Sequence, residues 1–214
     1  MNFTDEFLKA AEQLVKCIDR CQVEAVVDVL ATVRAEGGRL FLIGSGGGAG
    51  HASHAACDFR KLCNIESYAP YDNVSELTAR VNDEGWDVTI ANWLKVSRLN
   101  SKDCLFVFSV GGGNATANIS TNLVRAIQYA ITVGARTVGI VGKDGGYTAD
   151  AGNAAIVVPT IASSLLTPLA EGFQAVLWHL IVSHPKLQIN AAKWESLTPV
   201  TPVATEASVL NFQP

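Results

Sequence analysis

The chain has few charged residues and no long apolar run. No stretch approaches the roughly 18 consecutive apolar residues that span a membrane, and the N-terminus lacks the basic and apolar segments of a signal peptide. Charged residues make up 17% of the 214 residues, the net charge is −4, and no basic stripe is present. We therefore expect no membrane or nucleic-acid partner, a cytoplasmic location and one domain with a full core.

The chain also lacks the dense cysteine framework of a small secreted domain. Its five cysteines are an odd number, and reduced cytoplasmic thiols are the simplest interpretation of Cys17, Cys21, Cys57, Cys63 and Cys104. Cys17 and Cys21 share a helix face and could form half a metal site. Small, buried apolar side chains are the simpler interpretation of this pair.

Apolar residues follow helical spacing from residue 4 to residue 36, with a break near residues 19–21, and Gly37-Gly38 ends the second segment. This pattern predicts two N-terminal helices within residues 1–37. Their apolar positions are more numerous than packing on one sheet face requires. We therefore expect these helices to form a subunit interface.

Beyond residue 37, apolar strand-like runs alternate with helical stretches. The strands are expected at 40–43, 104–109, 137–141 and 155–159, and the helices at about 50–63, 87–97, 115–133 and 164–183. Continuous apolar strands separated by helices predict an α/β fold, a three-layer sandwich with a central parallel sheet. This α/β core spans residues 38–190 and forms one domain with the first 37 residues. Residues 191–214 contain three prolines and are expected to form a C-terminal arm, extended or partly disordered.

Three glycine-rich turns follow three of the predicted strands, with the sequences GSGGG (44–48), SVGGGN (109–114) and GKDGG (142–146). Tight strand–helix turns need glycine in any case, but three at one sheet edge favour a ligand site. The dinucleotide and Walker patterns are absent. Free backbone N–H groups at a helix N-terminus bind anions, so we expect phosphate near Ser45, Gly46, Gly47, Gly48, Ser109, Gly111, Gly112 and Asn114.

Two pairs of metal-competent side chains have same-face helical spacing. His54 and Asp58 are four residues apart, and Glu171 and His179 are eight residues apart. The two pairs could close around one zinc-like ion, or act as acid and base on an enediol. Alternatively, His54 and Asp58 only pair with each other, and His179 is a hydrogen-bonded core histidine.

The segments GSGGGAGHASHAACDF, SVGGGN, VGKDGG and EGFQAVLWHL resemble the SIS (sugar isomerase) domain. Within it they are most similar to the phosphoheptose isomerases, which interconvert sedoheptulose 7-phosphate and a heptose 7-phosphate. The resemblance covers about residues 4–185. It implies a SIS or flavodoxin-like sheet, a phosphosugar substrate in carbohydrate metabolism, and a homotetramer built on the N-terminal helices with active sites between subunits.

The resemblance also implies roles for individual residues. In the family, a His and a Glu four residues later bind zinc (Zn2+) together with a Gln and a His eight residues apart on the last helix. The matching metal positions here are His54, Asp58, Glu171 and His179. Asp58 and His179 take the catalytic proton-transfer roles. The resemblance also implies that Glu171 contacts the substrate. Asp83 is expected there too, because Asn82-Asp83 resembles an Asn-Asp pair near the family's active site. An ordinary helix end explains this pair equally well.

The chain departs from the family in its phosphate-binding loops. Gly48 stands where the family has a serine, and the second glycine turn has fewer hydroxyls. Lys143 and Arg60 are the nearest cations, and each could be a plain surface charge. The sequence favours a phosphosugar isomerase. The alternatives are a non-catalytic SIS protein that binds or senses a sugar phosphate, and a related reaction on another sugar phosphate or an activated sugar.

Overall fold

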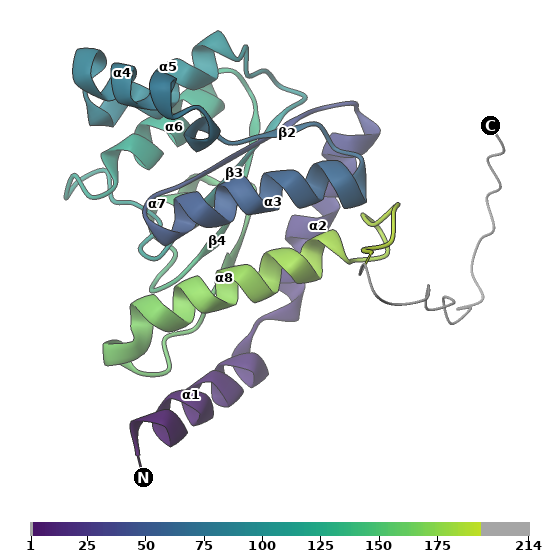
Figure 1. The fold of residues 1–214 in the computed structure, drawn as a ribbon, viewed down its shortest axis with the longest axis vertical. Coiled ribbons are helices and arrows are strands. Elements are labelled where there is room, and N and C mark those ends of the chain that lie inside the picture. Colours follow the sequence, from purple (N-terminus) through teal and green to yellow (C-terminus); the bar gives the residue numbers. More distant parts are fainter. Residues whose placement is uncertain (1, 194–214) are drawn as a thin grey trace, which may run out of the picture.

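The computed structural model describes residues 2–193, so the predicted C-terminal arm lies outside the described residues from residue 194 onward. A five-stranded parallel sheet in the order β2-β1-β3-β4-β5 forms the centre (Figure 1). Its strands are β1 (Leu40–Gly44), β2 (Ser67–Tyr68), β3 (Cys104–Ser109), β4 (Arg136–Val141) and β5 (Ala154–Val157). β1 and β3 are buried along their whole length, as apolar strands covered on both faces should be.

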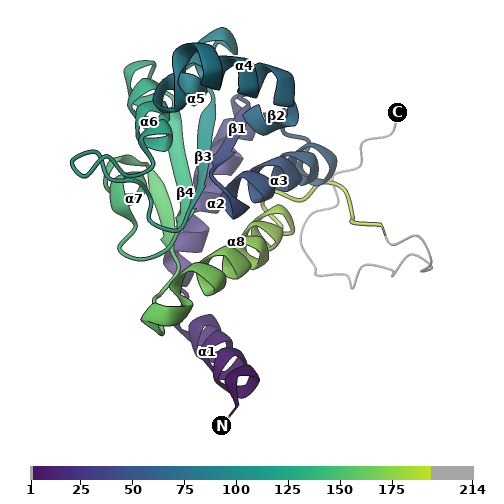
Figure 2. The same ribbon diagram turned by 60° about the vertical axis from the view of Figure 1, so that its left-hand side comes forward.

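One face of the sheet is covered by α2 (Arg20–Ala35), α3 (Gly47–Cys63) and α8 (Leu166–Val182), which lie together in Figure 2. Phe59 of α3 and Trp178 of α8 are buried in the core on this side, together with Phe106 and Phe108 of β3. α3 and α8 run side by side (Figure 1). This pairing brings the two helices that carry the predicted histidines into contact.

The other face is covered by α5 (Trp86–Val96), α6 (Thr121–Thr132) and α7 (Gly146–Ala151). Their core includes Ile90, Leu123 and Ile127, packed on Phe41 and Leu105. A short 3-10 turn η1 (Pro70–Asp72) and α4 (Val74–Glu84) follow β2 at the edge of the sheet. Helices on both faces confirm the predicted three-layer α/β sandwich.

The second glycine turn is followed by a loop, where a helix was expected from residue 115. α6 begins only at Thr121. Asn114 and Ile119 exchange backbone hydrogen bonds of 2.9 and 3.0 Å, and Ser120 has a positive φ of 51°. The prediction of a helix over residues 115–120 is therefore wrong, because this local turn competes with helix formation. The strand β2 and the helices α4 and α7 were not predicted.

Two helices occupy the N-terminal region, α1 (Phe3–Cys17) and α2, and α1 projects away from the body (Figures 1 and 2). The helices break at Ile18, and the carboxylate of Asp19 caps α2 by accepting from the N–H of Cys21 at 2.8 Å. Cys17 and Cys21 are therefore on different helices, and both are exposed. The expectation that the pair shares one helix face as half a metal site is wrong because the break separates the two residues, and the expectation of buried side chains is wrong because both are exposed.

The segment Ser163–Val182 is apolar and long enough, by length and composition, to cross a membrane. Polar residues such as Glu171, Gln174 and His179 interrupt its apolar sequence, but they are few enough to leave a mean hydropathy of 1.4 in the most apolar window. The buried Trp178 and Ile181 fix one side of this helix to the sheet. Core helices of water-soluble proteins pass the same length and composition test.

Candidate active site

The three glycine turns meet at one edge of the sheet. The strand register pairs Gly44 with Phe108, and Ser109 with Val141, so β1, β3 and β4 end side by side. Parallel strands place their carboxyl ends at the same edge, where ligands of open α/β sheets bind. The predicted juxtaposition of the three turns is confirmed.

The first glycine turn (44–48, the first loop) leads directly into α3. Gly46 has a positive φ of 57°, and α3 starts at Gly47. The N–H of Gly48 is bonded to Ser45 O at 3.0 Å, whereas the N–H groups of Gly46 and Gly47 have no hydrogen-bond acceptor among residues 2–193. The first loop therefore presents free donors at the positive end of a helix.

Gly48 has a packing role in the first loop. A Cβ at this position would lie 2.5 Å from the carbonyl oxygen of Phe108 on β3. A serine here, as the resemblance would have it, does not fit the backbone of β3. The missing hydroxyl is therefore a consequence of close packing between α3 and the sheet.

Two side chains that sequence reasoning missed hold the first loop. Tyr71 of η1 accepts from the N–H of Gly44 at 2.9 Å and donates to the Gly44 carbonyl. Burial raises the pKa of the Tyr71 phenol well above its usual value, so it stays a hydrogen-bond donor. Asn122 of α6 is fully buried and its Nδ2 donates to Ser45 Oγ at 3.3 Å. Neither contact has a local sequence signal, because each partner comes from a distant element.

The second glycine turn (109–114, the second loop) is used mainly for packing. Ser109 Oγ accepts from the N–H of Gly112 at 3.0 Å. The carbonyl of Gly112 accepts from the Thr148 N–H at 2.9 Å and from Thr148 Oγ1 at 2.7 Å, which caps the start of α7. A Cβ on Gly112 would overlap the carbonyl of Gly145 in the third turn. Asn114 Oδ1 accepts from the N–H of Ala117 at 2.8 Å. Much of the second loop's predicted phosphate-binding capacity is therefore used within the protein.

A cluster of three side chains, here called the triad, lies where α3 and α8 run side by side. It consists of His54, Asp58 and His179. One potential ligand atom from each lies within 4.8 Å of the others. The two imidazole rings are nearly perpendicular, with centroids 5.5 Å apart. His179 Nδ1 lies 2.7 Å from the carbonyl of Ala175. Donation to this carbonyl places the proton on Nδ1 and leaves Nε2 as the free nitrogen.

The donors of the triad fit a zinc ion. Two imidazole nitrogens and one carboxylate oxygen are typical zinc ligands, and three protein ligands leave a position for substrate or water. Glu171, the predicted fourth ligand, lies elsewhere: a Cβ on Gly47 would be 2.7–2.9 Å from its carboxylate atoms. The structure thus joins three of the four predicted ligands and places the fourth on the first loop.

His51 also belongs to this region, although only its neighbours His54 and Asp58 were singled out by spacing. Its ring is half-buried beside Phe108, with centroids 6.1 Å apart. Burial lowers the pKa of His51, and the nearby charges of His54 and His179 act in the same direction, while the backbone and carboxylate of Glu171 oppose the shift. The sequence signal that could have found His51 is its position three residues before His54, in the segment HASH (51–54).

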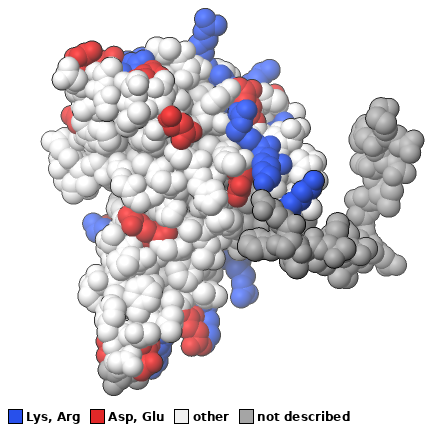
Figure 3. Space-filling model, viewed as in Figure 1, with Lys and Arg blue, Asp and Glu red and all other residues white. Residues whose placement is uncertain are grey.

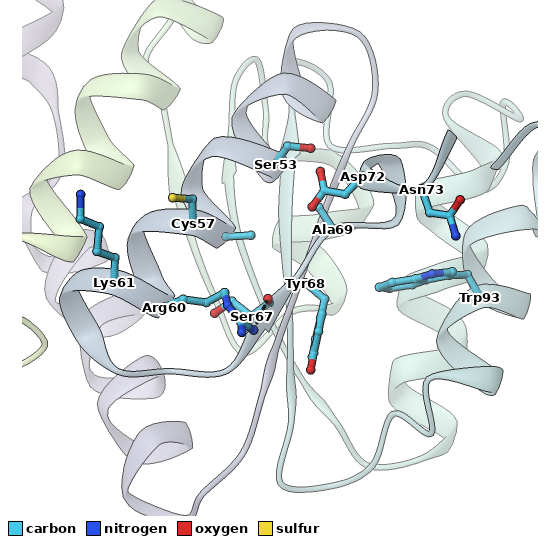
Figure 4. A pocket seen from close by; sticks show the side chains of 11 residues that line it. Ser53, Cys57, Arg60, Lys61, Ser67, Tyr68, Ala69, Asp72, Asn73 and Trp93 are labelled. Atoms are coloured by element: carbon cyan, nitrogen blue, oxygen red, sulfur yellow. Dashed lines mark hydrogen bonds between the residues drawn. The ribbon is translucent and has the colours of Figure 1, made fainter. Parts of the chain in front are cut away.

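The remaining predicted residues lie outside the triad. Asp83 is exposed in the last turn of α4 and accepts from Asn82 at 2.7 Å. Lys143 is exposed and lies 3.5 Å from Asp144. Arg60 lines a different pocket of about 750 Å³, between α3, β2 and α5, together with Lys61 (Figure 4). None of these charges is placed against the first loop.

Comparison with known proteins gives consistent similarities. A SIS domain family model matches residues 2–142. A lincomycin biosynthesis protein from Streptomyces lincolnensis is 33% identical over 159 residues, 69% of this chain, and the chain spans 56% of that protein's length. A phosphoheptose isomerase from a Nitratiruptor species is 31% identical over 150 residues, 68% of this chain and 74% of that protein.

The fold is shared with a solved phosphoheptose isomerase from Neisseria gonorrhoeae. The TM-score is 0.70 at 21% identity, and the match covers 84% of this chain and 93% of that one. At this level of identity the likeness concerns the fold, which agrees with the five-stranded parallel sheet described above.

Proposed function

The chain belongs to the SIS domain family, and we propose that it is a phosphosugar isomerase of the phosphoheptose isomerase kind, which interconverts sedoheptulose 7-phosphate and a heptose 7-phosphate. The observation that carries the proposal is the triad of His54, Asp58 and His179, of which His54 and Asp58 lie on α3, the helix that follows the first loop. Aldose–ketose isomerisation moves a proton between C1 and C2 of the sugar through an enediol. That step needs a base that reaches the proton on the carbon next to the carbonyl, and an acid that reaches the carbonyl oxygen as it becomes a hydroxyl.

Asp58 and His179 are assigned to the proton transfer. The Asp58 carboxylate has two oxygens, so one can hold a metal while the other accepts a proton. His179 has only Nε2 free, because Nδ1 is engaged with Ala175. Metal binding and proton transfer by His179 therefore exclude each other at any one moment. Metal content and turnover measured on the same His179→Gln protein distinguish the two roles, because a variant that keeps its metal and loses turnover has lost an acid or base.

The triad would hold the zinc ion, with Glu171 remaining a predicted fourth ligand that must leave Gly47 to join it. A bound divalent cation would polarise the sugar carbonyl and its neighbouring hydroxyl, which stabilises an enediolate. The phosphate group is proposed to bind the free N–H groups of Gly46 and Gly47, with Ser45. From the second loop, the N–H of Gly111 and the hydroxyl proton of Ser109 complete the phosphate site. The substrate-binding role of Asp83 remains a prediction.

The proposal includes a cytoplasmic homotetramer with active sites between subunits. Apolar side chains are exposed on two helices: Phe3, Leu8 and Val15 on α1, and Val176 and Leu180 on α8. Val15, Val176 and Leu180 line a groove of about 380 Å³, and few charged side chains lie over α8 in Figure 3. Burying such surface between chains is favourable. Light scattering should give four chains per particle, whereas a monomer would contradict this part of the proposal.

The test measures conversion of sedoheptulose 7-phosphate together with metal content. Asp58→Asn and His179→Gln should each lower kcat at least about 100-fold, as expected for loss of an acid or base. Elemental analysis should find about one zinc or similar ion per chain, lost in the His54→Ala/His179→Ala double variant. Undiminished turnover in His179→Gln would refute the mechanism. Absence of both metal and turnover in the wild-type protein would favour the alternative, a non-catalytic protein that binds a sugar phosphate.

A further inference from the structure

The indole ring of Trp178 contacts both imidazole rings of the triad. Trp178 is 1% exposed and belongs to the core, whereas His54 and His179 are exposed. The indole stacks on the His179 imidazole, with ring centroids 3.5 Å apart and planes inclined by 27°. It meets the His54 imidazole edge-on, with centroids 4.7 Å apart and planes inclined by 66°. One buried ring is therefore in contact with two exposed histidines that are proposed to bind the same metal ion.

The His54 ring lacks the hydrogen bond that usually orients a metal-binding histidine. Such histidines donate their second ring N–H to a carboxylate or a carbonyl, which fixes the plane of the ring. His179 has this kind of contact, between Nδ1 and the carbonyl of Ala175 at 2.7 Å. Within residues 2–193, the His54 side chain forms no hydrogen bond, and its aromatic ring contacts are with Trp178 and His179. Packing against the indole is therefore the contact that can hold the His54 ring in place.

The indole nitrogen of Trp178 is not explained by the packing of the core. Nε1 is buried and has no hydrogen-bond partner in the described part of the chain. A buried donor without a partner costs stability, and a phenylalanine or a leucine fills a core position without that cost. The contacts with His54 and His179 give the indole a role that apolar packing alone does not supply.

We propose that Trp178 is a positioning residue, a rigid surface that holds the imidazole rings of His54 and His179 in the orientation that binds a divalent metal ion. This inference rests on the proposed function and deepens it, because it adds a support to the triad. Exposed side chains lose rotamer freedom when they bind a metal ion. Rings that already rest on a buried indole lose less, so the metal binds more tightly. Trp178 supplies no ligand atom itself, since its N–H group is only a donor.

The experiment measures the zinc affinity of metal-stripped protein by competition with a chromogenic chelator. Trp178→Met keeps an apolar side chain in the core and removes the flat ring. We expect this variant to bind zinc at least about tenfold more weakly, the usual size of effect when the support of a metal ligand is lost. Trp178→Phe keeps an aromatic ring at the same place, and its zinc affinity should stay within about threefold of the wild type. A Trp178→Phe protein as weak as Trp178→Met would overturn the role of an aromatic surface.

Phe106→Met is the matched control, because it makes the same kind of change in the same core. Phe106 is buried on β3, and its aromatic ring contacts are with Phe59 and Phe108. This variant should lose stability but keep its zinc affinity within about twofold of the wild type, since it shares no contact with the triad rings. Unchanged zinc affinity in Trp178→Met would overturn the inference. Equal losses in Trp178→Met and Phe106→Met would overturn it too, because they would reflect a perturbed core.

A second measurement uses the wild-type core and stands even if Trp178→Met does not fold. In metal-free protein with isotope-labelled histidine, the ring protons of His54 and His179 should resonate away from the values of free histidine, because the indole ring current shifts them. Comparison with His54→Gln and His179→Gln assigns the signals. Free-histidine values for both rings would show that they do not rest on the indole, and would overturn the inference.

Failure of the inference is distinguishable from failure of the proposed function. Absence of zinc binding in the wild type would overturn the role of Trp178. Turnover of sedoheptulose 7-phosphate by that protein would nevertheless leave the isomerase proposal standing. Conversely, weaker zinc binding by Trp178→Met than by Phe106→Met, in a protein without turnover, would support the inference and favour the non-catalytic alternative.

Discussion

The first and second loops are alike in sequence and different in use. The first loop leaves the N–H groups of Gly46 and Gly47 free at the start of α3, and the Glu171 carboxylate lies where a side chain on Gly47 would be. The second loop is followed by a turn instead of a helix, and its Gly112 carbonyl caps α7 through Thr148. A run of three glycines can thus create an anion site or let two loops pack together.

The difference follows from what comes after each glycine run. A helix that begins inside the run points its unpaired N–H groups at the sheet edge, as α3 does. Where the chain turns first, as at residues 114–120, the glycines are free to approach a neighbouring loop. We therefore assign ligand binding mainly to the first loop and structural support mainly to the second, and the predictions below test this division.

The largest expected effect is on stability, from an alanine in each loop. Gly112→Ala should lower the free energy of unfolding by about 3 kcal/mol, because Gly112 has a φ of +68° and a Cβ would overlap the Gly145 carbonyl. Gly47→Ala should change it by less than about 1 kcal/mol, because its Cβ would meet only the flexible end of Glu171. Urea denaturation of both variants measures this. Equal losses would show that the two loops are packed alike.

A middle-sized effect is expected where the second loop caps α7. Thr148→Val should lower the free energy of unfolding by about 2 kcal/mol, because it leaves the buried Gly112 carbonyl with one hydrogen bond fewer. Thr132→Val is the matched control, since its hydroxyl donates to Tyr129 O on an exposed helix end, and less than about 0.5 kcal/mol should be lost. Thermal and urea unfolding provide the measurement. A Thr148→Val protein as stable as the control would remove the structural role of the second loop.

The smallest expected effect separates the serines of the two loops by enzyme kinetics. Ser45→Ala should raise the KM for sedoheptulose 7-phosphate about fivefold, because the phosphate site loses a hydroxyl at the free end of the first loop. Ser109→Ala should raise KM less, and should lower the free energy of unfolding by about 1 kcal/mol, since Ser109 Oγ accepts from Gly112. A larger rise in KM for Ser109→Ala would place the phosphate mainly on the second loop.

Much of the fold could be predicted from local patterns. The four longer strands match apolar runs, because a strand covered on both faces needs a continuous apolar sequence. The start of α6 was predicted too early, since the Asn114–Ile119 turn depends on backbone hydrogen bonds that periodicity does not reveal. The two-residue strand β2 and the short helix α7 are too brief to show a period.

Part of the candidate site was also within reach of the sequence. The spacing of His54 and Asp58 placed both on one face of α3, and the triad includes them with His179. Tyr71 and Asn122 were missed, because each contacts the first loop from an element distant in the chain. The sequence predicted Glu171 as a metal ligand but did not reveal that its carboxylate lies beside Gly47, because that contact also joins distant elements.

The sequence by itself determined a parallel α/β sheet with three glycine turns at one edge, and a helix face carrying His54 and Asp58. Strand burial, turn chemistry and helical spacing are local properties, which the sequence displays directly. Only the tertiary structure decided which turn keeps its N–H groups free and which side chain lies beside Gly47. That choice depends on how α8 packs along α3 and how Thr148 approaches Gly112, and these contacts join segments that are far apart in the sequence.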